Sequence, residues 1–241
     1  MMEYYCATDI GLVREKNQDS YLAIENANGD SLFLVCDGIG GGKAGEVASS
    51  EVVKHMRNAF PDAYKFSSLI DAEEYISREL KYANRLVYDL SCKHEEYEGM
   101  GTTVTGLLFT EFGVLSINIG DSRVYGFLDN MYFKLTKDHT LINEMLEAGT
   151  ITYEESLNHP KKHYLTRALG IYRTTMFDIH KVKEMDHYVV CSDGLHGYVS
   201  ENEITRIVYD DKDVKSRTLD LVNLALLKGG FDNITVVLID R

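Results

Sequence analysis

Apolar residues along the chain form two kinds of pattern, short continuous runs and stripes at helical spacing. Strand-like runs lie at 3–8, 21–25, 32–36, 102–109, 113–119, 123–128, 131–135, 176–181, 187–191 and 233–239. Apolar residues recur at the spacing of an amphipathic helix over 45–60, 71–93, 201–209 and 214–227. Strands, two helices, strands, two helices and a strand therefore follow one another. This order predicts an α+β fold, an α-β-β-α sandwich in which two central antiparallel sheets are flanked by pairs of helices.

The connections between these elements are short, with one exception. Two-residue connections at 111–112 and 129–130 predict that the strands between 102 and 135 form an antiparallel meander. The segment 138–160 is polar and long for a connection, which indicates a functional flap at roughly 139–165. Two short helical patches lie inside it, and we expect His139, His159 and His163 to be surface or substrate-edge residues rather than metal ligands. No repeat or linker interrupts the chain, so we expect one domain over 1–241.

Composition narrows the class of protein. The 241 residues carry a net charge of −13, which argues against a nucleic-acid partner because such a protein needs a cationic surface. No window of about 20 apolar residues is present, and the first residues lack the pattern of a signal peptide. The four cysteines form no CxxC pair, which predicts reduced, buried thiols and a cytoplasmic protein. We expect no membrane association and a monomer.

Acidic residues follow several of the apolar runs. Five aspartates lie at strand ends or in adjoining turns: Asp19, Asp37, Asp121, Asp193 and Asp232. A single aspartate in a turn more often makes a local hydrogen bond than binds a ligand. Taken together they are harder to explain, because carboxylates that face one another need cations to neutralise them. Oxygen ligands without a Cys/His cluster favour Mg²⁺ or Mn²⁺ over zinc.

Eight motifs occur in order along nearly the whole chain. They read TDIGLVREKNQD, VCDGIGGGKAGEVAS, GMGTTVT, NIGDSRVY, LTKDHTLINEM, LTRALG, CSDGL and GGFDNITVVLI. With these motifs the chain resembles the metal-dependent protein phosphatases, the type 2C serine/threonine phosphatases, in their compact bacterial form. The resemblance implies hydrolysis of phosphoserine and phosphothreonine in proteins by a metal-activated water, without a phosphoenzyme.

The resemblance also implies roles for the residues that match the motifs. Asp37 would bridge two Mn²⁺ or Mg²⁺ ions, with the Gly38 carbonyl as a further ligand. Asp193 and Asp232 would complete the first ion. Asp19 would hold the second ion, partly through water. This core site is physically sensible, since paired ions activate water and neutralise charge on a transferred phosphoryl group.

Two further roles follow from the same motifs. Asp121, together with Asp193, would bind a third and weaker ion. Arg14 would clamp the substrate phosphate, a role that suits the forked guanidinium. We therefore expect Arg14 and Asp37 to be the catalytic residues.

The chain departs from its relatives at two positions. Ile39 stands where some relatives carry a histidine proposed as the general acid, and as an apolar residue it should serve packing. Gly197 stands where relatives often carry an acid, at the position expected for the third ion. His196 beside it is a candidate proton donor, but we favour a hydrogen-bonded or solvated histidine.

Two other functions fit the same sequence. One is a non-catalytic module that binds phosphoproteins, and the retained carboxylates argue against it. The other is a hydrolase of small phosphorylated molecules. The leading hypothesis remains a protein phosphatase whose partners are phosphorylated proteins, including a bacterial Ser/Thr kinase whose action it reverses.

Overall fold

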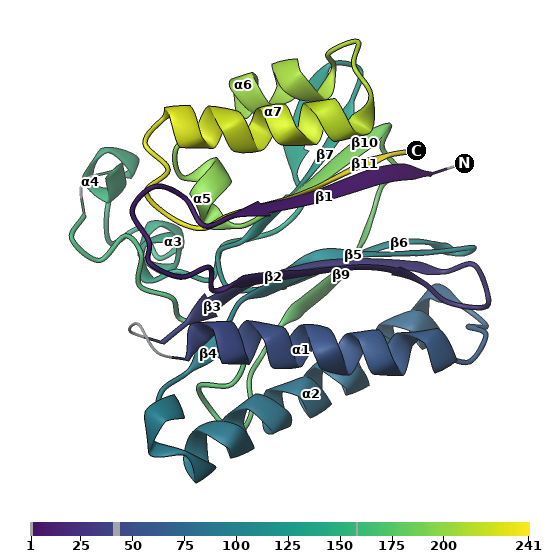
Figure 1. Cartoon of the computed structure of the whole chain (residues 1–241), viewed down its shortest axis with the longest axis vertical. Coiled ribbons are helices and arrows are strands. Elements are labelled where there is room, and N and C mark those ends of the chain that lie inside the picture. The colour runs from purple at the N-terminus through teal and green to yellow at the C-terminus, as the bar shows by residue number, and fades with distance from the viewer. Residues whose placement is uncertain (1, 41–43, 158) are drawn as a thin grey trace.

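The computed structural model describes residues 2–40, 44–157 and 159–241, so residues 41–43 of the glycine-rich turn lie outside it. Two antiparallel sheets stack face to face between two layers of helices (Figure 1). The first sheet has the order β1 (Glu3–Asp9), β11 (Ile234–Asp240), β10 (His187–Cys191), β7 (Arg123–Leu128) and β8 (Met131–Lys134). The second has the order β2 (Asp19–Glu25), β3 (Ser31–Ile39), β5 (Val104–Thr110), β6 (Gly113–Ile119) and β9 (Asp178–Val182), with β4 (Gly101–Thr102) pairing β3. The predicted α-β-β-α sandwich is confirmed.

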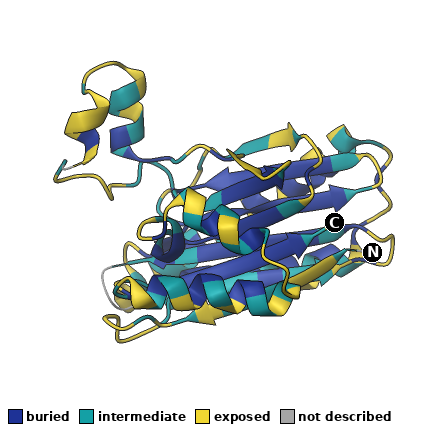
Figure 2. Cartoon of the chain, turned by 90° about the horizontal axis from the view of Figure 1, so that it is seen from above, coloured by how far each residue is buried: buried dark blue, intermediate teal, exposed yellow. Residues whose placement is uncertain are grey.

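The long helices cover the outer faces of the sheets, as their apolar stripes predict. Helices α1 (Gly45–Ala59) and α2 (Leu69–Lys93) cover the second sheet, and α6 (Glu201–Val208) and α7 (Val214–Leu227) cover the first (Figure 1). The predicted flap holds α3 (Leu141–Glu147) and α4 (Tyr153–Leu157), which project from one end of the sheets (Figure 2). The residues of α4 are mostly exposed, whereas those of α3 are mostly half-buried. Short helical turns complete the described elements: Phe60–Asp62, Glu95–Tyr97 and α5 (Asp193–His196).

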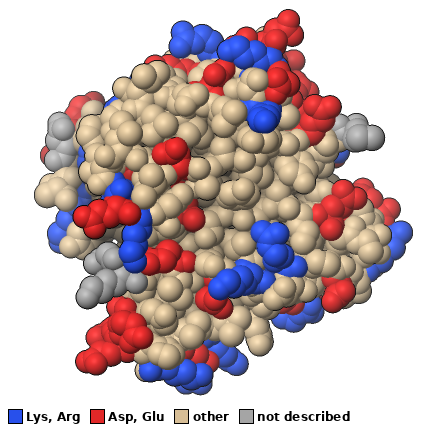
Figure 3. Space-filling model, in the orientation of Figure 1, with Lys and Arg blue, Asp and Glu red and all other residues tan. Residues whose placement is uncertain are grey.

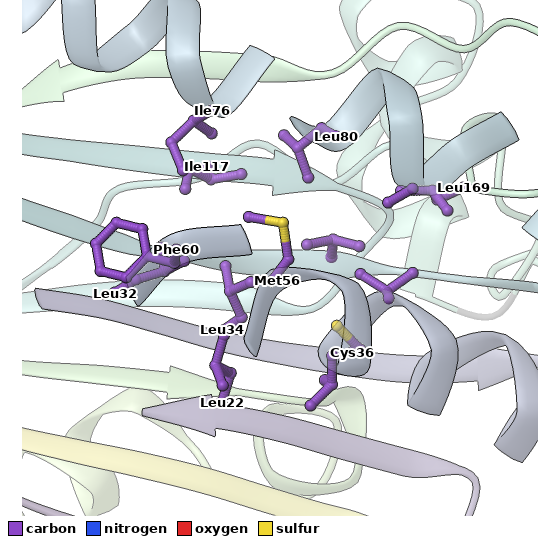
Figure 4. Close-up of a cluster of buried hydrophobic side chains, with 14 of the residues drawn as sticks. Leu22, Leu32, Leu34, Cys36, Met56, Phe60, Ile76, Leu80, Ile117 and Leu169 are labelled. Carbon is purple, nitrogen blue, oxygen red and sulfur yellow. The ribbon is translucent and has the colours of Figure 1, made fainter. Parts of the chain in front are cut away.

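Three apolar layers hold the sandwich together. Leu34 of β3 packs with Met56 and Leu80 between the second sheet and its helices (Figure 4). Phe33, the preceding residue of β3, packs between the two sheets, where Tyr188 of the other sheet also lies. Neighbouring residues of β3 are therefore buried on opposite faces, which explains its continuous apolar sequence.

The predicted meander between 102 and 135 is wrong, because its strands belong to two different sheets. β5 pairs with β6 in the second sheet, whereas β7 pairs with β8 and β10 in the first. The chain changes sheets in the turn from 120 to 122. Gly120 adopts a positive φ of 103° there, a conformation that L side chains rarely adopt. Hydrophobic pattern alone does not reveal such a change, since the strands on both sides are equally apolar.

The predicted strand at 102–109 is also interrupted, at Thr103 between β4 and β5. The four cysteines are free. Cys36 and Cys191 are buried as predicted, but Cys6 is only half-buried and Cys92 is exposed. None of the helices in the described residues has the length and apolar character that a membrane crossing requires.

Candidate active site

Two aspartates of the second sheet face each other directly. In the antiparallel pairing of β2 with β3, Asp19 is the register partner of Asp37. Side chains at such paired positions lie close together, so like charges there destabilise the sheet. Burial raises the pKa of both carboxyls, to about 6 for Asp19, and the charge of Asp19 raises the pKa of Asp37 further. A protein without a cation to place there has little reason to bury such a pair.

The first sheet brings two more aspartates to the same end of the sandwich. Asp193 begins α5 directly after β10, and Asp232 lies two residues before β11. The fifth, Asp121, lies in the turn where the chain changes sheets. Burial raises the pKa of Asp193, and the charges of Asp121, Asp232 and Asp19 raise it further.

These side chains surround a cleft of about 650 Å³. Asp37, Asp121, Asp193 and Asp232 line it, and Asp19 is buried beside Asp37. The structure therefore brings together all five aspartates singled out in the sequence, from both sheets and from the turn between them.

The donor set fits divalent cations. Asp19 Oδ1 and Asp193 Oδ1 are buried and have no hydrogen-bond partner, as expected of oxygens reserved for a metal. Among the described residues, no group of three Asp, Glu, His or Cys side chains is arranged to hold one ion by itself. Backbone carbonyls and water would have to complete the coordination, which suits Mg²⁺ and similar hard ions.

Arg14 lies at the rim of the cleft, paired with one of the candidate ligands. Its Nη2 donates to Asp232 Oδ2 at 2.6 Å, and the Arg14 side chain is 51% exposed. The pair raises the pKa of Arg14, mainly through this hydrogen bond. In this arrangement Arg14 and Asp232 satisfy each other, so binding of an ion by Asp232 would free the guanidinium for an anion.

Asn233 holds the loop that carries Arg14, a role that sequence analysis missed. Its Oδ1 accepts the Gln18 N–H at 2.8 Å, and its Nδ2 donates to the carbonyls of Ile10 and Lys16 at 2.9 Å each. The side chain is buried and ties the 10–18 loop to the residue beside Asp232. The DN pair in the eighth motif was the available signal.

Thr102 and Thr103 fix the backbone of Asp37, whereas sequence analysis had treated them only as part of a strand. The Asp37 carbonyl accepts hydrogen bonds from Thr103 N–H at 2.8 Å and from Thr102 Oγ1 at 2.9 Å. The Asp37 N–H donates to Thr103 Oγ1 at 2.9 Å. Ser192, also missed, donates from its hydroxyl to Asp19 Oδ2 at 2.7 Å.

The remaining residues named from sequence lie at or beside the cleft. Gly38 is buried, and its N–H donates to the Gln18 carbonyl at 3.1 Å. Ile39 lines the cleft, and its expected role in packing stays a prediction. Gly197 donates its N–H to the Asp193 carbonyl at 2.8 Å and ends α5. Because Gly197 has no carboxylate to offer, the predicted ligands for a third ion are the carboxylates of Asp121 and Asp193 alone.

His196 and His139 are both hydrogen-bonded near the cleft, but they hold different parts of the structure. His196 is hydrogen-bonded through Nε2 to the Asp121 carbonyl at 3.0 Å, and burial lowers its pKa, so it is a hydrogen-bonded residue as favoured. His139, expected at the surface or the substrate edge, is only 3% exposed, whereas His163, covered by the same expectation, lines the cleft. The Nδ1 of His139 accepts the Gly120 N–H at 3.2 Å, and its Nε2 lies 3.0 Å from Asp178. His139 thus anchors the flap to the turn that presents Asp121.

Charge is distributed unevenly between the site and the surface. The face seen in Figure 3 mixes acidic and basic side chains, separated by uncharged surface. Inside the cleft the charges are of one sign apart from Arg14 at its rim, because the site aspartates are close enough to raise one another's pKa.

Known proteins share both the sequence and the structure of this chain. A family model described as protein phosphatase 2C matches residues 13–220. Protein phosphatase PhpP of Streptococcus pneumoniae is 35% identical over 240 residues, which cover 99% of this chain and 97% of that protein. A putative protein phosphatase 2C-type of Streptococcus pyogenes is 33% identical over 240 residues, which again cover 99% of this chain and 97% of that protein.

Solved structures agree with the sequence matches. The crystal structure of serine/threonine phosphatase Stp1 from Staphylococcus aureus has a TM-score of 0.93 at 32% identity, covering 100% of this chain and 95% of that one. The family predicted from the eight motifs is thus confirmed by the family model, by relatives matched over nearly their whole length and by the fold. The chain belongs to the protein phosphatase 2C family of serine/threonine phosphatases.

Proposed function

We propose that the chain removes phosphate from phosphoserine and phosphothreonine in proteins through a metal-activated water. The observation that carries this proposal is the direct pairing of Asp19 with Asp37, joined by Asp193 and Asp232 from the other sheet. We further propose that residues 1–241 form one catalytic domain.

The residues divide the work of holding the ions. Asp37 would bridge two ions, with the Gly38 carbonyl beside it, and Asp193 and Asp232 would complete the first. Asp19 would hold the second ion, partly through water. When bound, Mn²⁺ or Mg²⁺ supplies a nucleophile from water at neutral pH and neutralises charge on the phosphoryl group. Asp121 and Asp193 would hold a weaker third ion.

Arg14 would bind the phosphate. Its guanidinium is half-exposed at the rim of the cleft and would be freed from Asp232 if that carboxylate held an ion. A forked guanidinium matches two phosphate oxygens and orients the phosphorus toward the nucleophile.

Direct attack by water is supported by the lining of the cleft. Among the described residues that line the cleft, Thr103 is the only Ser, Thr or Cys, the residue types that could attack phosphate through a hydroxyl or thiol. Its hydroxyl already accepts from the Asp37 N–H and lies 2.8 Å from Ser122 Oγ. Thr103 is therefore committed to positioning Asp37 and is not presented as a nucleophile.

The names of the relatives support a proposal for the cellular setting. The relatives' names describe bacterial serine/threonine phosphatases, and we propose that this chain likewise acts on phosphorylated proteins. We propose a cytoplasmic monomer that reverses the action of a Ser/Thr kinase.

The proposal is tested with p-nitrophenyl phosphate and Mn²⁺, with an EDTA control. Asp37→Ala removes the bridging carboxylate and should lower kcat by at least about 100-fold, as expected when an electrostatic element of the transition state is lost. Asp211→Ala, in the exposed turn between α6 and α7, is the matched control and should keep full activity. A wild-type protein that binds a phosphopeptide but hydrolyses nothing with either ion would refute the catalytic function and favour a binding module.

A phosphopeptide compared with phosphorylated metabolites decides the substrate class. The proposal requires a higher kcat/KM for the phosphopeptide. A preference for the small phosphoesters would instead identify a hydrolase of small molecules.

A further inference from the structure

An exposed apolar surface adjoins the cleft on the side of the Arg14 loop. Leu12 is 69% exposed, Phe231 is 50% exposed and Tyr198 is 36% exposed. We name these three residues, with the Gly229–Gly230 backbone between them, the rim patch. Large apolar side chains that are both exposed and contiguous mark interaction surfaces more often than scattered ones do.

The contacts show that the rim patch is continuous. The Leu12 N–H donates to the Gly230 carbonyl at 2.7 Å, and a Cβ on Gly230 would lie 2.9 Å from Leu12 Cγ. A Cβ on Gly229 would lie 2.1 Å from the Phe231 ring. The rings of Phe231 and Tyr198 contact each other, with centroids 5.3 Å apart. Two glycines thus allow Leu12 and Phe231 to lie against the same short stretch of backbone.

The rim patch is also continuous with the catalytic cleft. Phe231 and Tyr198 both line the cleft with the candidate metal ligands. Phe231 precedes Asp232, and Leu12 lies two residues before Arg14, whose side chain pairs with Asp232. A phosphorylated side chain placed between Arg14 and the aspartates would therefore lie beside the rim patch, within reach of the residues that flank it in the substrate.

We propose that the rim patch binds an apolar side chain that flanks the phosphorylated Ser or Thr in a protein substrate. This proposal rests on the proposed phosphatase function and specifies its substrates. An aliphatic or aromatic residue beside the phosphorylated one would cover Phe231 and Leu12, which solvent otherwise covers. Aromatic residues in such positions contribute large contact area at low cost in conformational entropy.

The test uses a set of phosphoserine peptides in a Gly/Ser background, with one leucine moved from three residues before the phosphoserine to three residues after it. With Mn²⁺, wild-type protein should hydrolyse the peptide with leucine at the favoured position with a kcat/KM about 10-fold above the all-Gly/Ser peptide, as expected for burial of an aliphatic side chain. Phe231→Ser and, independently, Leu12→Ser should each reduce this ratio toward one. Phe112→Ser, an exposed aromatic position in the β5–β6 turn at the opposite end of β6 from Asp121, is the matched control and should retain it.

The outcomes distinguish failure of the rim patch proposal from failure of the proposed phosphatase function. Hydrolysis of every peptide at the same rate, or a leucine preference that both variants retain, would overturn the rim patch proposal and leave the phosphatase function intact. No hydrolysis of any peptide would overturn both. Size-exclusion chromatography at the assay concentration should show that wild type and Phe231→Ser elute alike. A wild-type dimer that Phe231→Ser dissociates would overturn the proposal by showing that a second copy of the chain occupies the rim patch.

Discussion

Replacing Asp19 with asparagine should stabilise the protein when metal is removed. Asp19 is 8% exposed, faces Asp37 across β2 and β3, and accepts a hydrogen bond from the Ser192 hydroxyl that an asparagine oxygen can also accept. Burial raises the pKa of Asp19 from 3.8 to about 6. Since tenfold in an equilibrium constant is about 1.36 kcal/mol, this rise corresponds to about 3 kcal/mol lost from the free energy of unfolding once the group is ionised.

The sign of the pH dependence follows from the direction of this pKa change. At pH 4, Asp19 is protonated in the folded chain and only about half ionised in the unfolded chain, so little of the difference is present and wild type and Asp19→Asn should be similar in stability. As pH rises through 6, wild type must ionise a buried carboxyl beside Asp37, whereas the amide of the variant stays neutral. At pH 8 in EDTA the variant should be about 3 kcal/mol more stable, or about 6 to 12 °C in Tm for a chain of this size.

Thermal and urea denaturation in EDTA at pH 4 and pH 8 measure the effect directly. Asp211→Asn, an exposed aspartate, should show no difference at either pH. Saturating Mn²⁺ should reverse the order, because wild type gains binding free energy that the variant has largely lost. If Asp19→Asn were more stable than wild type by the same amount at both pH values, or no more stable at pH 8, ionisation of the buried Asp19 would not explain the difference.

Other predictions concern single side chains. Asn233→Ala removes three hydrogen bonds to the Arg14 loop and should lower the free energy of unfolding by roughly 2 to 4 kcal/mol in urea titrations; an unchanged midpoint would contradict the bracing role. Arg14→Gln should raise KM for phosphopeptides and lower kcat/KM by about 10² to 10³, a change of the size seen when a charge-assisted contact to the reacting group is lost. A loss confined to metal affinity would speak against phosphate binding by Arg14. Leu80→Ala, fully inside the α1/α2 core, should cost about 2 to 5 kcal/mol in stability while leaving KM unchanged.

Most of the fold could be predicted from the sequence because the elements are locally consistent. β3 is buried on both faces and has an unbroken apolar sequence, and α2 repeats its apolar stripe over 25 residues. The change of sheet at Gly120 was missed, since β6 and β7 are both buried strands and β7 pairs with β10, which lies far away in the sequence. Pairing of distant strands is a tertiary property that periodicity does not encode.

The candidate site was predictable for a different reason. Asp19, Asp37 and Asp232 stand inside distinctive motifs, so their types and spacing pointed to a metal centre. The supporting residues were missed because Thr103 and Ser192 have ordinary side chains whose role depends on which backbone or carboxylate lies opposite. The prediction for His139 was wrong because a polar, helix-poor segment suggests exposure, whereas its imidazole is buried between Gly120 and Asp178.

The strand order of the first sheet limits when that sheet can form during synthesis of the chain. β11 lies between β1 and β10, and its pairing with β1 joins Glu3 to Asp240. β11, the neighbour of β1 in this sheet, is synthesised more than 200 residues after β1, so the first sheet cannot close until β11 has been made. The segment that closes the sheet also brings Asp232 and Asn233. A nascent chain therefore acquires Asp232, the candidate metal ligand latest in the sequence, together with the strand that completes the first sheet.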